Sequence, residues 1–226
     1  MKKITIIQQQ KKPININVCG ITSIEQIDQM DKLHIDFVSL CFDENSSNCV
    51  IGKIDPSECK YVDIDTKKIG VFTNQSEDFI LKKIEDFGLD LIQLNGNEMP
   101  TFCFKLSKEI EVIKNFNLDF NNDHLLNDFL KNYDEVCDYY IFNSSFPSNI
   151  QMLDSKTWQN LINYSIEKPF FIGSEFIKPS DAPAFQHFKH PDFLGIELGS
   201  QFEKSTNTKD TSMILSFSRA LNQVVN

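Results

Sequence analysis

The chain has 226 residues, 41% of them apolar, and a formal net charge of −10. The apolar share is ordinary for a folded globular protein, so a chain that is disordered throughout is excluded. The negative charge and the single arginine, Arg219, leave no basic face for a nucleic acid and remove the usual bidentate clamp for a phosphate.

Eight short apolar runs are predicted to form strands. Each is nearly continuous in apolar residues, which is typical of strands that are buried on both faces, as in a parallel sheet. In chain order they are 16–19, 36–42, 68–74, 89–95, 111–116, 138–144, 169–174 and 194–200.

Helix signals lie between these strands. Ser23 is the expected N-cap of one helix, with Gln26 as its capping-box partner. Ser76 is the expected N-cap of another, which Gly88 ends.

The other helix signals differ in strength. The stretch 55–62 predicts no more than a turn or two, and Pro183 predicts an irregular start for the helix that follows Pro179. A last helix is expected from about Asp210 to Asn222.

The number and order of these elements indicate the fold. Eight strand–helix units in one chain are the count of a (β/α)8 TIM barrel, and we expect a tail at 1–13 followed by one barrel at 14–226. A doubly wound open sheet is the competing architecture, but neither G-x-G-x-x-G nor G-x-x-x-x-G-K occurs. The carboxyl ends of barrel strands share one rim, where five side chains should therefore meet: Cys19, Gln93, Asn143, Ser174 and Glu197.

Other site classes find little support. The six cysteines contain no C-x-x-C pair, and His187 and His190 lack a carboxylate pattern, so we expect neither a metal nor a cofactor. The apolar runs are far shorter than the ~20 residues of a membrane span, and the first residues do not read as a secretory signal. We therefore expect a cytoplasmic protein with no membrane partner.

Several segments carry a family resemblance. NVCGIT at 17–22, KIGVFTN at 68–74, DLIQLNGNE at 90–98 and HPDFLGIELGSQFE at 190–203, followed by Lys209 and Asp210, resemble phosphoribosylanthranilate isomerase. The resemblance implies a (β/α)8 barrel and an Amadori rearrangement in tryptophan biosynthesis. In that reaction the aminoaldose phosphoribosylanthranilate becomes an aminoketose.

The resemblance also implies roles for two residues. The family's base is a cysteine on the first strand, and that position is Cys19; the lysine two residues earlier in the family is Asn17 here, which removes a positive charge. The family's acid is an aspartate at the end of the sixth strand, and that position is Asn143. An amide is no proton donor, so we expect to lose the ~10²–10⁴-fold in rate that a general acid contributes.

Further positions are those that bind substrate in the family. The family's arginine aligns with Asn48, its glycine loops for the phosphate align with 150–153 and 174–176, and its last-strand aspartate aligns with Glu197. Bulky residues and Glu175 in those loops oppose a phosphate. The remaining substrate-binding candidates are Gln93, Ser174, Gly199 and Ser200.

Three functions stay open at this point. One is an isomerase with an eroded site that binds its sugar phosphate weakly. Another is an inactive barrel that serves as a binding or assembly partner, either of another enzyme of the pathway or in a homodimer. A third is a barrel re-used for another small ligand, with Cys19, Gln93 and Glu197 lining the pocket.

Overall fold

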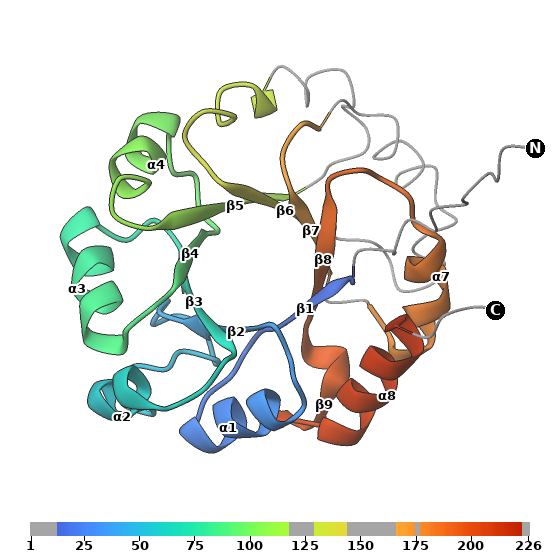
Figure 1. The fold of residues 1–226 in the computed structure, drawn as a ribbon. Coiled ribbons are helices and arrows are strands. Elements are labelled where there is room, and N and C mark those ends of the chain that lie inside the picture. The colour runs from blue at the N-terminus through green and yellow to red at the C-terminus, as the bar shows by residue number, and fades with distance from the viewer. Residues whose placement is uncertain (1–12, 118–128, 144–165, 175–176, 223–226) are drawn as a thin grey trace, which may run out of the picture.

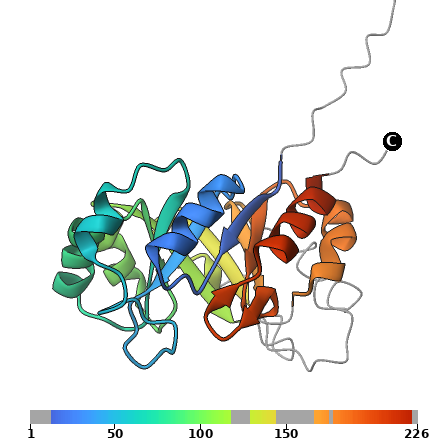
Figure 2. The ribbon, with the colours of Figure 1, turned by 90° about the horizontal axis from the view of Figure 1, so that it is seen from below.

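The protein folds as a closed barrel of eight parallel strands in chain order, with β8 pairing back to β1. The computed structural model describes residues 13–117, 129–143, 166–174 and 177–222. Helices surround the strands on the outside (Figures 1 and 2). The predicted (β/α)8 TIM barrel is therefore confirmed.

All eight predicted strands are confirmed, with ends that differ from the prediction by at most two residues. They are β1 (Asn15–Val18), β2 (Phe37–Cys41), β3 (Lys67–Phe72), β4 (Leu91–Leu94), β5 (Glu111–Asn117), β6 (Tyr139–Asn143), β7 (Phe170–Ser174) and β8 (Phe193–Leu198). The α-helices of the described residues are α1 (Ile24–Lys32), α2 (Pro56–Tyr61), α3 (Glu77–Phe87), α4 (Pro100–Leu106), α7 (Ala182–His187) and α8 (Thr211–Asn222). Within the described part of the chain, no helix is both long enough and apolar enough to cross a membrane.

The helix ends follow the predicted caps with one correction. Ser23 and Ser76 each accept a hydrogen bond from the backbone N–H three residues on, and Gly88 ends α3 with a left-handed φ of 61°. The capping box at Gln26 is wrong, because its Oε1 accepts from the N–H of Thr22 at 2.9 Å. The Gln26 side chain therefore pairs with the residue before the N-cap instead of with the N-cap itself.

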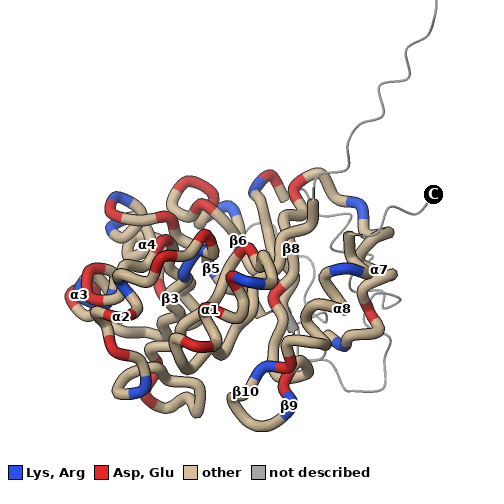
Figure 3. The backbone as a smooth tube through the Cα atoms, turned by 60° about the horizontal axis from the view of Figure 1, so that its bottom comes forward, with Lys and Arg blue, Asp and Glu red and all other residues tan. Residues whose placement is uncertain are grey.

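The weaker helix signals are also confirmed. The stretch after β2 makes only the six-residue helix α2, and a 3-10 turn at Pro179–Asp181 precedes α7. A short hairpin was not expected: β9 (Glu203–Ser205) pairs antiparallel with β10 (Thr208–Lys209) just after β8. Figure 3 shows its acidic and basic residues close together at one end of the barrel.

Two packed layers form the core. The larger cluster fills the space between strands and helices, and the smaller one fills the barrel interior with five buried side chains: Ile69, Leu91, Ile113, Ile141 and Phe171. On the outer side of β5, Lys114 forms a 3.1 Å ion pair with Glu98, and each side chain is 3% exposed. The apolar interior layer closes the barrel below the polar groups described next.

Candidate active site

A polar layer lies above the apolar layer, toward the carboxyl ends of the strands. Side chains two residues apart on a strand point to the same face. Gln93, Asn115 and Asn143 therefore follow Leu91, Ile113 and Ile141 into the barrel interior. This alternation brings amides from three neighbouring strands to one end of the barrel.

A hydrogen-bonded chain crosses this layer from β2 to β8. Ser39 Oγ donates to Asn17 Oδ1 at 2.9 Å, and Asn17 Nδ2 donates to Glu197 Oε2 at 3.0 Å. All three residues are buried. The chain orients the Glu197 carboxyl group from one side.

Gln93 reaches the same carboxyl group from β4. Its side chain favours the charged form of the Glu197 carboxyl group and so lowers its pKa, and its Nε2 donates to Asn95 Oδ1 at 3.0 Å. Its Oε1 is buried and has no hydrogen-bond partner among the described residues. An unpaired buried acceptor is costly, and such groups cluster where a ligand completes the pairing.

Glu197 is held in an unusual protonation equilibrium. Burial raises the pKa of its carboxyl group from 4.5 to about 7, while the hydrogen bond from Gln93, the charge of Lys209 and the hydrogen bond from Asn17 oppose the rise. Both the neutral and the charged form are therefore populated near pH 7. A group of this kind suits acid–base chemistry.

Cys19 follows β1 directly and lies beside the end of β8. Its N–H donates to the carbonyl of Leu198 at 3.0 Å, and part of the residue is accessible to solvent. Burial within the surrounding protein is nevertheless the main cause that raises the pKa of its thiol, and the charges of Glu197 and Glu203 add to the rise. Lys209 lowers the pKa of Cys19 but does not outweigh these effects.

The hairpin after β8 brings a buried cation to this end of the barrel. Lys209 Nζ lies 2.7 Å from Glu203 Oε1, and their side chains are 1% and 12% exposed. A Cβ atom at Gly20, where φ is 74°, would lie 3.2 Å from Lys209 Nζ and 2.9 Å from Asn48 Nδ2. The glycine thus lets Lys209 and Asn48 approach the chain next to Cys19.

Asn143 is the last residue of β6, and its side chain lies on the interior face of the strand. Its Nδ2 donates to Asn115 Oδ1 at 2.9 Å. A Cβ atom at Gly173 would lie 2.5 Å from Asn143 Oδ1, so only a glycine there leaves room for the amide. The side chain is placed at the strand end as predicted, but it carries no exchangeable acid proton.

The remaining predicted positions lie at the same end. Ser174 is the last residue of β7 and pairs in register with Leu198 of β8. Gly199 and Ser200 follow β8 directly, in a 3-10 turn where the carbonyl of Gly199 accepts from the N–H of Phe202 at 3.2 Å. The predicted phosphate-loop positions 150–153, 175 and 176 lie outside the described residues.

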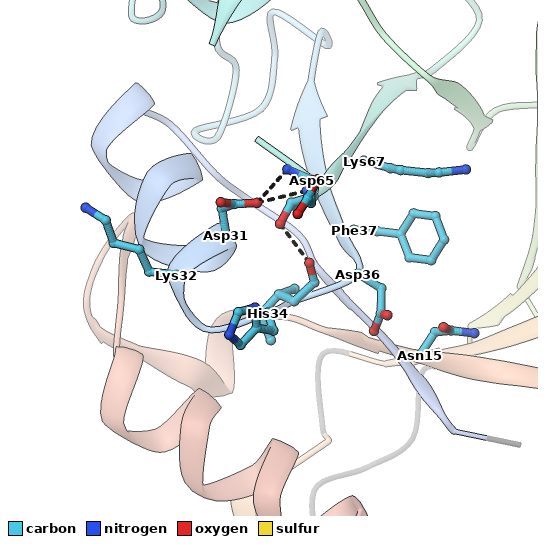
Figure 4. Close-up of a pocket in the computed structure, with 10 residues that line it drawn as sticks. Asn15, Asp31, Lys32, His34, Asp36, Phe37, Asp65 and Lys67 are labelled. Carbon is cyan, nitrogen blue, oxygen red and sulfur yellow. Dashed lines mark hydrogen bonds between the residues drawn. The ribbon is translucent and has the colours of Figure 1, made fainter. Parts of the chain in front are cut away.

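A separate hollow of about 720 Å³ lies at the opposite end of the barrel, beside the first residues of β1, β2 and β3 (Figure 4). Two of its carboxylates have structural partners: Asp31 Oδ1 accepts from the N–H groups of Asp65 and Thr66 at 2.9 Å, and Asp36 Oδ2 accepts from the N–H of Ile16 at 2.8 Å. None of the predicted site residues lines it. We therefore place the candidate site at the carboxyl ends and not in this hollow.

The described regions contain no cluster of three or more His, Cys, Asp or Glu residues that could hold a metal ion. The polar end of the barrel is built from amides, the carboxyl groups of Glu197 and Glu203, the Ser39 hydroxyl, the Cys19 thiol and the Lys209 ammonium group.

Comparisons with known proteins agree with this architecture. The family model for N-(5'-phosphoribosyl)anthranilate isomerase matches residues 16–220. The chain belongs to this family. The isomerase of Parabacteroides distasonis is 31% identical over 206 residues, which cover 89% of this chain and 90% of the relative.

Solved structures of phosphoribosylanthranilate isomerases share the fold. The isomerase of Thermotoga maritima superposes with a TM-score of 0.75 at 20% identity, covering 92% of this chain and 98% of that one. Another superposes with a TM-score of 0.73 at 20% identity and equal coverage, and was solved in complex with reduced 1-(o-carboxyphenylamino)-1-deoxyribulose 5-phosphate. At this identity the likeness shows the fold alone.

Three residues of the site were not predicted from the isomerase resemblance. Asn17 and Ser39 orient Glu197, and Lys209 supplies a positive charge beside Cys19. Lys209 was visible in the sequence as part of a family motif, but its approach to Cys19 depends on the unpredicted hairpin. Asn17 was interpreted only as a lost lysine.

Proposed function

We propose that this protein isomerises N-(5'-phosphoribosyl)anthranilate, an aminoaldose, to the corresponding aminoketose in tryptophan biosynthesis, and that it does so slowly. The observation that carries the proposal is the shared position of Cys19, Gln93 and Glu197 at the carboxyl ends of the strands in a member of this isomerase family. A cytoplasmic location and a sugar phosphate as partner are parts of the same proposal.

The slow rate follows from the acid position. Asn143 donates its amide N–H to Asn115 and has no acid proton to give to a sugar ring oxygen. A positioned general acid contributes ~10²–10⁴-fold in rate. We expect kcat/KM to lie below that of a relative with an aspartate at this position by a factor in that range.

The test is a direct assay of the purified protein with phosphoribosylanthranilate, beside the isomerase of Parabacteroides distasonis. Turnover reduced by about 10²–10⁴-fold supports the proposal. A rate equal to that of the relative contradicts the expected impairment. Growth of a tryptophan auxotroph that lacks this isomerase, when the chain is overproduced, provides the matching test in cells.

A non-catalytic role is the second candidate, in which the barrel binds or assembles with another enzyme of the pathway or a second copy of itself. The pairing of Asn143 with Asn115 favours it, because the two amides bond each other. Complete absence of turnover, together with copurification of a partner enzyme, would support this candidate over the first.

A further inference from the structure

We propose that Glu197 carries the proton transfers of the reaction, first as the acid that opens the sugar ring and then as the base that takes the proton from the second carbon. The inference rests on the proposed isomerase function and names the group that performs it. It assigns to one carboxyl group of β8 what the family pattern divides between Cys19 and the position of Asn143. The reaction stays slow because one group must serve both steps, without the separate acid of the family at position 143.

The other groups at this end of the barrel are poorly suited to proton transfer. Asn143 is an amide bonded to Asn115. Lys209 and Glu203 are tied to each other at 2.7 Å. The Cys19 thiol must be a thiolate to act as a base, and its burial disfavours that form.

The surroundings of Glu197 come from five strands. Asn17 and Cys19 face it from β1 and its end, Gln93 from β4, and Lys209 from β10, while Gly173 of β7 pairs beside it without a side chain. Glu203 of β9 acts on Cys19 and is neutralised by Lys209. Lys209 is thus the cation that opposes the burial cost, and the resulting pKa of about 7 leaves both forms of Glu197 accessible.

Gln93 supplies a place for the sugar beside this carboxyl group. The Gln93 side chain acts on the Glu197 carboxyl group, donates its nitrogen to Asn95, and leaves its carbonyl oxygen buried and unpaired among the described residues. A sugar hydroxyl is a donor that would satisfy this oxygen. Because the Gln93 side chain is close enough to Glu197 to influence its pKa, a hydroxyl held by this oxygen lies near the Glu197 carboxyl group.

The proton balance closes with a single group. Neutral Glu197 gives its proton to the ring oxygen as the bond between that oxygen and the first carbon breaks, and the nitrogen lone pair forms a C=N bond. The carboxylate then removes the proton from the second carbon; the C–H electrons form a C=C bond, and the C=N electrons return to nitrogen. Glu197 is neutral again, and the enol tautomerises to the ketone by exchange with water.

The two mechanisms predict opposite pH dependences. If Glu197 must start protonated, kcat/KM is constant below pH 7 and falls about tenfold per pH unit above it. If a Cys19 thiolate is the base, kcat/KM rises with pH throughout this range, because the thiol is mostly protonated. The measurement is kcat/KM from pH 6 to 9 for the unmodified protein, Glu197→Gln and Cys19→Ser.

Three results support the proposal together. The unmodified protein loses activity above pH 7, Glu197→Gln lowers kcat at least 100-fold with KM changed less than threefold, and Cys19→Ser stays within tenfold of the unmodified protein. Glu111→Gln, the same substitution at the exposed start of β5, is the matched control and leaves kcat unchanged. The pH profiles of the unmodified protein and Cys19→Ser decide the matter even if Glu197→Gln does not fold.

Two results overturn it. Activity that rises with pH and is abolished by Cys19→Ser, with Glu197→Gln still active, leaves the isomerase function intact and removes Glu197 as its proton carrier. No turnover by the unmodified protein at any pH overturns the proposed function and this inference with it.

Discussion

Glu197→Gln should stabilise the protein at alkaline pH, because a charged carboxylate is expensive at this buried position. The pKa of Glu197 is about 7 in the folded protein, against 4.5 for an ordinary glutamate. Its favourable contribution is therefore fully present below pH 4.5 and is lost as the pH rises through 7. With each tenfold change in the protonation equilibrium worth about 1.4 kcal/mol, the loss approaches about 3 kcal/mol above pH 8.

Glutamine keeps the shape of neutral glutamate and has no charge to desolvate. At pH 5 the two proteins should differ in free energy of unfolding by less than about 1 kcal/mol, and at pH 8.5 the variant should be more stable by about 3 kcal/mol. For a chain of this length each kcal/mol shifts Tm by about 2–4 °C. The variant should therefore gain up to about 10 °C at pH 8.5.

Urea unfolding at pH 5, 7 and 8.5 provides the measurement, with Glu111→Gln as the exposed control that should follow the unmodified protein. Parallel stability profiles for the unmodified protein and Glu197→Gln would refute the reasoning. They would mean that Glu197 ionises normally in the fold. This test is independent of catalysis, so it measures the carboxyl group even if the protein has no isomerase activity.

Three further changes have expected outcomes. Asn143→Asp supplies an acid at the family position and should raise kcat/KM at least tenfold in the isomerase assay. Asn115→Asp adds the same charge to the neighbouring strand and should not raise kcat/KM. Equal effects of the two substitutions would contradict a specific role for an acid at position 143. Lys114→Met leaves the buried Glu98 carboxylate without its cation and should lower the free energy of unfolding in urea by about 3–5 kcal/mol. Adding Glu98→Gln should recover part of this loss. A loss below about 1 kcal/mol would contradict the description of a buried ion pair. Gly20→Ala forces a side chain into a left-handed conformation against Asn48 and should lower both stability and kcat/KM, and unchanged Tm would show that the turn relaxes freely.

Much of the barrel was predictable because its signals are local. A strand that is buried on both faces must be apolar along its length, and such runs recur in the right number. Ser76 and Gly88 mark the ends of α3 because caps act within a few residues of the helix end. Gln26 was misassigned because two neighbouring N–H groups compete for one side-chain oxygen, and only the backbone path decides between them.

The candidate site was predictable as a set of positions but not as a set of chemical states. Cys19, Gln93, Asn143 and Glu197 lie at the carboxyl ends of the strands because parallel strands in a barrel all point one way. Asn17 was interpreted as the loss of a positive charge near Cys19. The fold returns a positive charge from Lys209, which is distant in sequence and reaches the thiol through the hairpin of β9 and β10.

The sequence by itself determined the barrel, the family and the loss of the acidic residue at 143, since each depends on residue types in a local pattern. Only the tertiary structure decided that the pKa of the Glu197 carboxyl group lies at about 7. That property depends on burial and on partners from β1, β4 and β10 around Glu197. Desolvation and charge act through space, so no pattern along the chain records them.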